Sequence, residues 1–355
     1  MAVVAVVLFL IFWHFHDSTD WEQFRWQRVW HLLIHAEPSW LLAALAATYA
    51  TYLLRAYRWK FFMDPFKPGS SVRVLFVGQI LGFSAIYLIG RPGELVRPAY
   101  IARWERVPFA SQVAIWLLER IYDTVAVSVL LALGLYFEPI RPNGAHAVLA
   151  LHRMHTGAFT VLTGTLVVVA ALIAYRQYSD KLIGWGSRTF RFLPLSVRTW
   201  LGNLARSFAE GLDVIRNWKD LTASVLCSLV LWILNVSIFW FVYQSLGGRL
   251  AELSWWVAGV TLVFAAMGLV LQLPGLGGGF QVGALLALEQ IFHVPAAAAA
   301  SAVVLEWILI LVPCVTLAVV FLIYEGLTFR KLQAMAEAER LALAHGGTAA
   351  AGGST

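Results

Sequence analysis

Long apolar runs alternate with shorter polar connections along most of the chain. Nine such runs can be read from the sequence, at 2–15, 39–62, 74–90, 110–136, 156–174, 221–246, 255–273, 281–293 and 296–324. A helix needs about 20 residues to cross the hydrocarbon core of a bilayer, and several runs reach that length. The pattern therefore predicts an all-α protein that crosses a membrane several times.

The charges between the runs indicate that two of the apolar segments turn back instead of crossing. The connection 55–73 carries five Lys or Arg residues and 91–106 carries four, yet only the run 74–90 separates them. Because basic connections stay in the cytoplasm, we expect 74–104 to enter from that side and return to it. The segment 255–293 is the mirror case, since its flanks carry almost no positive charge. Both segments are predicted to be re-entrant helical hairpins.

This reading gives six full spans plus two re-entrant hairpins arranged as an inverted repeat, with both termini in the cytoplasm. Interrupted helices at matching places of two inverted units are typical of transporters. The alternative is eight plain spans. The chain is predicted to begin with a first span and an outward amphipathic helix (1–38), followed by repeat 1 with hairpin 74–104 (39–136). A connecting span with a cytoplasmic amphipathic helix (137–220) leads to repeat 2 with hairpin 255–293 (221–324), and a partly disordered cytoplasmic tail (325–355) ends it.

Two polar connections have the periodicity of helices that lie in the membrane interface. Residues 20–35 interleave five large apolar side chains with charged neighbours, and 196–219 repeats apolar positions at helical spacing. Amphipathic helices of this kind anchor membrane proteins or attract anionic lipids. We expect one helix in each segment.

Composition supports a membrane protein and excludes three other classes. Of the 355 residues 60% are hydrophobic and 13% charged, with a mean hydropathy of +0.73. Soluble domains have about 45–50% apolar and about 25% charged residues, so a soluble enzyme, a disordered chain and a disulfide scaffold are excluded. The two cysteines lie in apolar runs, so no metal or redox site is expected. The net charge of +6 is first a topology signal and second an indication of anionic partners.

Three charged residues interrupt the run 110–136. Glu119 and Asp123 are four positions apart and share a helix face, and Arg120 is three positions from Asp123. Charges inside a bilayer are costly and mark either a structural ion pair or a substrate or proton site that faces a wet cavity. By contrast, Arg55 and Arg58 lie near the inner end of 39–62 and are expected to extend toward the interface.

The first hairpin contains a helix break that carries charged side chains. Arg91, Gly93, Glu94 and Arg97 lie in the stretch from Gly90 to Pro98. A broken helix offers free N–H groups and the positive end of its dipole to an anion, and guanidinium groups match phosphate. This stretch is therefore a candidate anion site.

The second hairpin offers backbone groups in place of charge. Its turn contains Pro274, Gly275, Gly277 and Gly278, and Gln281 follows it. Successive glycine N–H groups can form a nest for an anion, although glycine-rich loops also serve packing alone. Glu306 lies deep in the last apolar run, between Leu305 and Trp307, and is a further candidate.

No enzyme motif, metal motif, cofactor loop or nucleic-acid signature accompanies these features. We therefore expect no catalytic residue, no metal and no cofactor.

The charged motifs resemble a known family of membrane proteins. Gly93-Glu94-Leu95-Val96-Arg97 is similar to a G-E-x-x-R motif, and Glu119-Arg120-Ile121-Tyr122-Asp123 to an E-R-x-x-D motif, of the flippase-like family. This family comprises the transmembrane domain of lysylphosphatidylglycerol synthases and its stand-alone relatives. Its third motif, a proline and a Gly-rich turn followed by a carboxylate, is similar to residues 274–281, but Gln281 stands where a Glu is usual.

The resemblance implies a lipid translocase of a bacterial inner membrane. In the full-length synthases a cytosolic domain aminoacylates phosphatidylglycerol and the membrane domain moves the product between leaflets. The 31-residue tail is too short for such a domain, so only translocation is expected and not an enzyme activity. The lipid would be an anionic phospholipid, an aminoacyl-phospholipid or a polyprenyl-linked lipid.

The expected substrate site draws on all three motifs and on Glu306. Its residues are Arg91, Gly93, Glu94, Arg97, Glu119, Arg120, Asp123, Pro274, Gly275, Gly277, Gly278, Gln281 and Glu306. The expected partners are membrane lipids with anionic headgroups and no nucleic acid; a homo-oligomer is left open. Two alternatives remain, a proton-coupled secondary transporter of a small anion and a non-catalytic partner in membrane lipid biosynthesis.

Overall fold

The computed structural model describes residues 26–138, 194–211, 218–269 and 278–324, and scattered positions between 156 and 185. Within these ranges the chain forms helices and no strand, which confirms the all-helical fold class. The predicted run 2–15 and the tail 325–355 lie outside the described residues, and 156–174 is described only at scattered positions.

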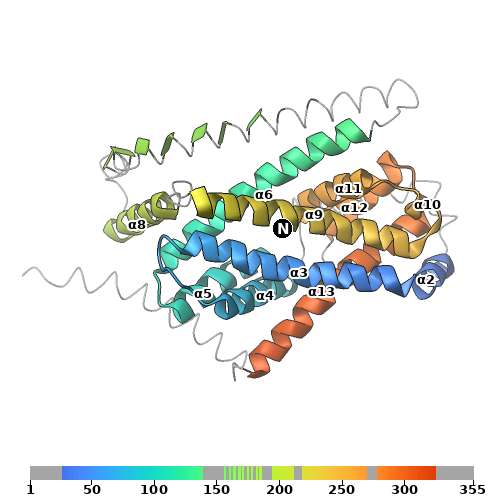
Figure 1. Cartoon of the computed structure of the whole chain (residues 1–355), viewed down its shortest axis with the longest axis horizontal. Helices are drawn as coiled ribbons and strands as arrows, with labels where there is room; N and C mark the ends of the chain where they lie inside the picture. Colours follow the sequence, from blue (N-terminus) through green and yellow to red (C-terminus); the bar gives the residue numbers. More distant parts are fainter. Residues whose placement is uncertain are drawn as a thin grey trace, which may run out of the picture.

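Two sets of helices follow one another in the same order, and each consists of a long helix, a hairpin and a second long helix (Figure 1). The first set is α3 (Pro38–Met63), α4 (Val72–Ile89), the short 3₁₀ helix η1 (Arg91–Leu95), α5 (Val96–Glu105) and α6 (Phe109–Phe137). The second set is α9 (Trp218–Leu246), α10 (Gly248–Ala251), α11 (Trp255–Gly268), α12 (Gly279–Leu286), the π-helical turn η4 (Ala287–Ile291) and α13 (Ala296–Tyr324).

Helices α3 and α9 lie side by side and run in opposite directions (Figure 1). Trp40 near the start of α3 contacts Trp240 near the end of α9, with ring centroids 5.5 Å apart. At the other end of the pair, Arg58 donates a hydrogen bond to Ser228 Oγ at 3.3 Å. The two sets of helices are therefore joined along their first members.

The first hairpin is an antiparallel pair of helices, α4 and α5, in tight contact. Gly90 ends α4 with a φ of 76°, which glycine adopts without strain. Further from the turn, a Cβ on Gly82 would lie 2.6 Å from Arg97 Cβ, and one on Gly78 would lie 2.8 Å from the Ile101 side chain. The glycines of α4 therefore let α5 pack close to its backbone.

The open end of this hairpin is closed by polar contacts. Lys67, just before α4, donates from Nζ to Glu105 Oε2 at 2.6 Å and to the Glu105 carbonyl at 2.8 Å. Glu105 Oε1 also accepts from the Ser71 N–H at 2.9 Å. The residues that precede α4 and the last residue of α5 consequently meet at the same end of the molecule.

The second hairpin repeats this arrangement with α11 and α12. Gly283 of α12 lies against the carbonyl of Phe264 on α11, and Gly268 lies against the carbonyl of Gly279, so a side chain at either glycine would clash. Gly268 meets Gly279, and four residues further from the connection on each helix Phe264 meets Gly283, so the two helices are antiparallel. Along the long axis of the molecule, the two hairpins occupy opposite halves (Figure 1).

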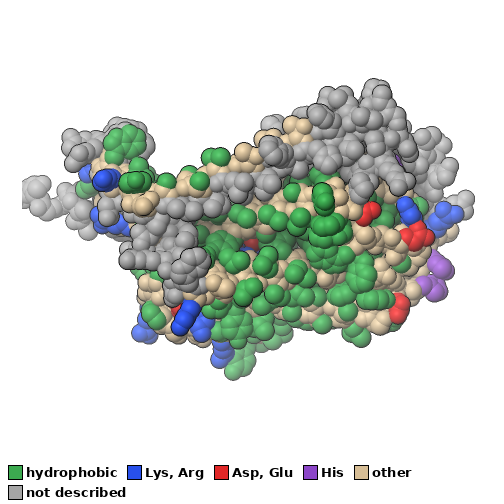
Figure 2. Space-filling view, turned by 45° about the horizontal axis from the view of Figure 1, so that its top comes forward, with side chains coloured by type: hydrophobic (Ala, Val, Ile, Leu, Met, Phe, Trp, Pro, Cys, Tyr) green, Lys and Arg blue, Asp and Glu red, His purple; other side chains and the backbone are tan. Residues whose placement is uncertain are grey.

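Helix length and composition identify a multi-pass membrane protein. Among the described residues, four helices are long and apolar enough to cross a bilayer: α4, α6, α9 from Lys219, and α13. Helices α5, α11 and α12 have 10, 14 and 8 residues, fewer than the about 20 that a crossing needs. Hydrophobic side chains cover the middle of the face in Figure 2, and charged side chains gather toward its two ends.

The amphipathic segments are helical in part. Helix α2 (Trp26–Ile34) buries Val29 and leaves Trp26 and Trp30 exposed, as expected of an interfacial helix. Helix α8 (Leu195–Gly211) covers most of the second segment. The prediction of one helix over 196–219 was wrong at its end, since Lys219 belongs to α9, which begins at Trp218.

Candidate functional site

Five charged side chains from α3, α5 and α6 meet inside the first set of helices. We call them the charged cluster: Arg58, Arg97, Glu119, Arg120 and Asp123. Asp123 is the middle residue of the 29-residue α6, so the cluster lies at the mid-length of a helix that can cross the membrane. Both the E-R-x-x-D and the G-E-x-x-R motifs contribute to it.

Glu119 is the centre of the charged cluster. It is 1% exposed, and its Oε1 accepts a hydrogen bond from Arg58 Nη2 at 2.7 Å. Its Oε2 accepts from Arg97 Nη2 and, at 3.3 Å, from Arg120 Nη2. Three guanidinium groups from three helices therefore share one buried carboxylate, as burial of a charge requires.

Asp123 lies one turn further along α6 and pairs with two of these arginines, Arg58 and Arg120. Its Oδ1 accepts from Arg58 Nη1 at 2.9 Å, and its Oδ2 lies 3.3 Å from Arg120 Nη2. The sequence predicted that Glu119 and Asp123 share a face and that Arg120 can pair with Asp123. Both features are present in the structure.

Arg58 is a central member that the sequence analysis misplaced. We expected its side chain to extend toward the interface, which was wrong: the residue is 0% exposed and bridges Glu119 and Asp123. A signal for this was present, because Thr48, Thr51, Arg55 and Arg58 repeat at helical spacing on one face of α3. The two threonines are buried as well.

Arg97 is fixed by contacts on several sides. Besides Glu119, its guanidinium donates to Gln79 Oε1 of α4. The same group stacks over the Trp59 ring at 4.3 Å and over Phe83 at 5.7 Å. Stacking and bidentate donation are both properties of Arg that Lys lacks. Arg97 is only 5% exposed, so it positions the cluster from the inside.

Arg120 is the accessible member of the charged cluster. Its side chain is 43% exposed, and its two contacts, to Glu119 and Asp123, are the longest ion pairs of the cluster. Glu94, half-buried in the first turn of η1, is close enough to interact electrostatically with Arg120. A ligand that approaches the cluster therefore meets Arg120 first.

The described side chains around the cluster carry more positive than negative charge. Arg55 interacts electrostatically with Asp123 and Glu119 and stacks over Phe83 at 5.0 Å. With it, four guanidinium groups face the three carboxylates of Glu94, Glu119 and Asp123, which leaves one positive charge in excess. Such a site favours an anion over a cation.

The other predicted site residues are placed as follows. Arg91 begins η1, but its side chain is not among those described, and Gly93 packs its backbone against Ala85 of α4. Pro274, Gly275 and Gly277 lie outside the described residues. Gly278 precedes α12 with a φ of 60°, and Gln281 lies in the first turn of that helix.

Glu306 is not part of the charged cluster. It lies on α13 and interacts with Tyr243 of α9, and none of the five cluster residues acts on it. Within the part of the chain that the structure describes, no group of three or more His, Cys, Asp or Glu side chains is arranged to hold a metal ion.

Comparison with known proteins places the chain among membrane proteins. The profile of a family described as "Lysylphosphatidylglycerol synthase TM region" matches residues 1–329. A UPF0104 membrane protein of Pyrococcus horikoshii is 25% identical over 290 residues, which are 77% of this chain and 80% of that protein.

Proposed function

The chain belongs to the family of the lysylphosphatidylglycerol synthase transmembrane region, and from this premise we propose that it is a lipid translocase, or flippase. Its substrate would be an anionic phospholipid, an aminoacyl-phospholipid or a polyprenyl-linked lipid, which it moves between leaflets. We place it in a bacterial inner membrane with both termini in the cytoplasm, because the connections 55–73, 91–106 and 175–220 are the most basic.

The observation that carries this proposal is the charged cluster at the mid-length of α6, with Arg120 exposed. Charged side chains within a membrane-crossing helix are expensive, and a structural ion pair alone would need equal numbers of opposite charges. The excess positive charge instead suits the phosphate of a headgroup on its way between leaflets. Arg120 would hold that phosphate with two parallel hydrogen bonds.

A change of partners at Arg120 would link headgroup binding to movement. The ion pairs of Arg120 with Glu119 and Asp123, both at 3.3 Å, are replaced when a phosphate takes up the guanidinium. Arg58 and Arg97 stay on Glu119 and keep that carboxylate compensated. The headgroup thereby binds two arrangements of the cluster with different affinity, which a ligand needs in order to shift an equilibrium.

We further propose that both hairpins are re-entrant and form an inverted repeat. The contact of Lys67 with Glu105 supports this for the first hairpin, because its two flanks meet at one end of the molecule. The short α11 and α12 in the opposite half support it for the second. Interrupted helices that meet from two sides frame a site near the bilayer midplane.

Translocation is tested with purified protein in liposomes that contain a fluorescent phosphatidylglycerol, by quenching the outer leaflet with dithionite. Arg120→Ala should slow translocation by about tenfold or more, the cost of one charge-assisted hydrogen bond. Arg120→Lys should recover only part of the rate, because Lys cannot bind phosphate through a fork. Arg249→Ala is the matched control, since Arg249 is an exposed arginine paired only with Glu252 among the described contacts. Equal rates in the Arg120→Ala and Arg249→Ala proteins would remove the proposed role of the cluster.

The same liposomes distinguish the second candidate, a proton-coupled transporter of a small anion. The excess positive charge of the cluster favours this function as well, because inorganic phosphate and a phosphate headgroup share their chemistry. Uptake of radioactive phosphate without movement of the fluorescent lipid would select the small-anion transporter. Absence of both activities would favour a non-catalytic partner in membrane lipid biosynthesis.

A further inference from the structure

Glu306 is a buried carboxyl group without a charged partner among the described residues. It lies in the first half of α13 and is 0% exposed, and among the described residues the Tyr243 hydroxyl is the one side-chain group close enough to act on its two oxygens. An ionised carboxylate in such a place costs far more free energy than folding can spare, so a carboxyl there takes up a proton. Glu119, by contrast, is buried with three guanidinium partners that compensate its charge.

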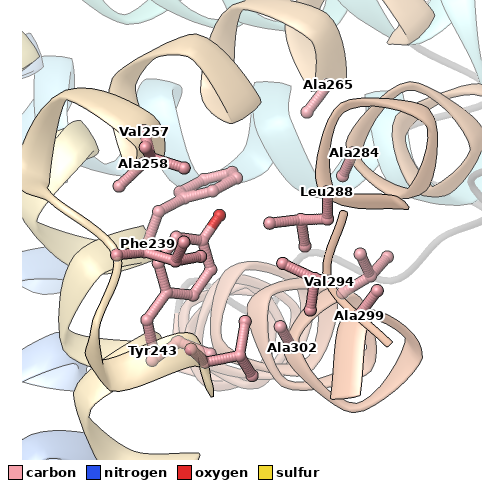
Figure 3. Close-up of a cluster of buried hydrophobic side chains, with 14 of the residues drawn as sticks. Phe239, Tyr243, Val257, Ala258, Ala265, Ala284, Leu288, Val294, Ala299 and Ala302 are labelled. Carbon is pink, nitrogen blue, oxygen red and sulfur yellow. The ribbon is translucent and has the colours of Figure 1, made fainter. Parts of the chain in front are cut away.

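Tyr243 of α9 is the one titratable group that acts on Glu306 among the described residues. It is also 0% exposed, and besides Glu306 its hydroxyl interacts with the buried Thr261 hydroxyl of α11. Figure 3 shows this hydroxyl pointing into a cluster of apolar side chains from α9, α11, α12, η4 and α13. Residues 270–277, which lie outside the described ranges, include no titratable side chain. No described Lys, Arg, His, Asp or Glu on any packed helix faces Glu306.

From this arrangement we propose that Glu306 is a proton-binding site that couples the protein to the proton gradient. In the described state the carboxyl carries its proton. When the helices around it separate and water enters, the proton passes to water and leaves a carboxylate, to which the Tyr243 hydroxyl then donates a hydrogen bond. Return to the described state requires the carboxylate to take up a proton again. The coupling rests on the proposed function, whereas the proton binding does not.

A row of aromatic contacts places both hairpins against the turn of α13 that carries Glu306. Trp307, the next residue, contacts Phe280 of the second hairpin with ring centroids 5.5 Å apart. It contacts Tyr87 of the first hairpin at the same separation, 5.5 Å. A shift of either hairpin tip therefore repacks the side chain next to Glu306, which gives the proton site a route to open.

The proton on Glu306 is tested with dicyclohexylcarbodiimide, an apolar reagent that modifies protonated carboxyl groups. The purified full chain is treated over a pH series and its peptides are analysed by mass spectrometry. We expect Glu306 to be modified at acid pH, with a rate that falls about tenfold per pH unit above its titration point. Tyr243→Phe should move this titration to higher pH, since the carboxylate loses its donor. No modification of Glu306 at any pH, or a rate without pH dependence, would overturn the proton site.

The coupling is tested by lipid translocation in liposomes with an imposed pH gradient. Glu306→Gln keeps the shape of a protonated carboxyl, so it should fold with an unchanged melting temperature and lose the response to the gradient. Glu289→Gln, on the half-buried carboxyl of η4, is the matched control and should keep that response. A wild-type protein without the response, or a Glu306→Gln protein that retains it, would overturn the coupling. If the wild-type protein moves no lipid but Glu306 is modified as expected, the proposed function fails and the proton site stands.

Discussion

At the scale of single residues, the charged cluster is stabilised only as long as its charges remain compensated. Glu119 provides the one carboxylate that Arg58 and Arg97 share, and both arginines are almost fully buried. Glu119→Gln removes that negative charge, which leaves the buried Arg97 guanidinium without a carboxylate among its described partners and leaves Arg58 with Asp123 alone. We expect it to lower the free energy of unfolding by about 3–5 kcal/mol, measured by denaturant unfolding in detergent.

The control for this prediction is an ion pair at the surface. Arg249 and Glu252 are 54% and 64% exposed and pair at 2.7 Å. Glu252→Gln should cost about 0.2–1 kcal/mol or less, because water replaces the lost partner. Equal losses for the two glutamines would mean that the buried cluster is hydrated and carries no special electrostatic balance.

The sequence reveals which residues are charged but not which partners they find. Glu119, Arg120 and Asp123 lie on one helix, so helical spacing alone predicts their proximity. Arg58 joins them from a helix more than fifty positions earlier, and no local rule gives that distance in space. The basic end of an apolar run usually extends toward the interface, and this general rule concealed the buried position of Arg58. Only the polar residues at helical spacing on one face of α3 indicated that Arg58 faces the interior of the protein.

At the scale of helices, the first hairpin depends on the absence of side chains at defined positions of α4. Gly82 faces Arg97, and a Cβ there would lie 2.6 Å from Arg97 Cβ. Gly82→Ala should push α5 outward and pull the Arg97 guanidinium away from Glu119. We expect a loss of lipid translocation comparable to that of Arg120→Ala, and a free energy of unfolding that is lower by about 1–3 kcal/mol because of overpacking.

Gly202→Ala provides the matched control for this substitution. Gly202 lies in α8, its φ is not positive, and a Cβ there would meet nothing within 4 Å. Alanine favours a helix over glycine by about 1 kcal/mol, so this variant should be as stable as the wild type or more stable. If Gly82→Ala behaved like Gly202→Ala, the close approach of α4 and α5 would not position Arg97.

The breaks between helices were easier to predict than their lengths. The Gly90-Arg91-Pro92-Gly93 stretch ends α4 where its Gly and Pro content indicates, and the hairpin that follows is antiparallel as expected. In the second hairpin, α12 continues into the π-helical turn at Ala287–Ile291, which no sequence rule indicated. Packing against α13 decides such a turn, and that packing depends on the whole fold.

At the scale of the whole molecule, the two hairpins decide whether the chain has an inverted repeat or a series of plain spans. Charge counts favoured the inverted repeat, whereas the helix lengths do not decide between the readings: α5 and α12 are too short to cross a bilayer, but α4 is long and apolar enough to do so. The two readings differ in where the flanks of each hairpin lie. A re-entrant hairpin has both flanks on one side of the membrane, whereas a run that crosses as a plain span, such as 74–90, leaves its two basic flanks on opposite sides.

Cysteine labelling in sealed vesicles therefore tests the topology directly. Cys227 and Cys314 are first replaced by Ser, and single cysteines are introduced at exposed positions on either side of each hairpin. Ser71→Cys and Arg103→Cys flank the first hairpin; Glu252→Cys and Gln290→Cys flank the second. We expect a membrane-impermeant maleimide to reach the first two from one side only and the second two from the opposite side only.

The decisive comparison in this experiment is between the two hairpins, and not within either of them. Lys67 and Glu105 already bring the flanks of the first hairpin together, so common labelling there follows from the fold in any membrane orientation. Only opposite labelling of the second pair establishes that the hairpins enter from opposite sides. Labelling of all four positions from the same side would place both hairpin tips at one depth and leave the charged cluster without a counterpart across the bilayer. The proposed path of a headgroup between leaflets would then have no second half. Permeabilised vesicles are the control: all four cysteines should react there, which shows that a lack of labelling in sealed vesicles reflects topology and not burial.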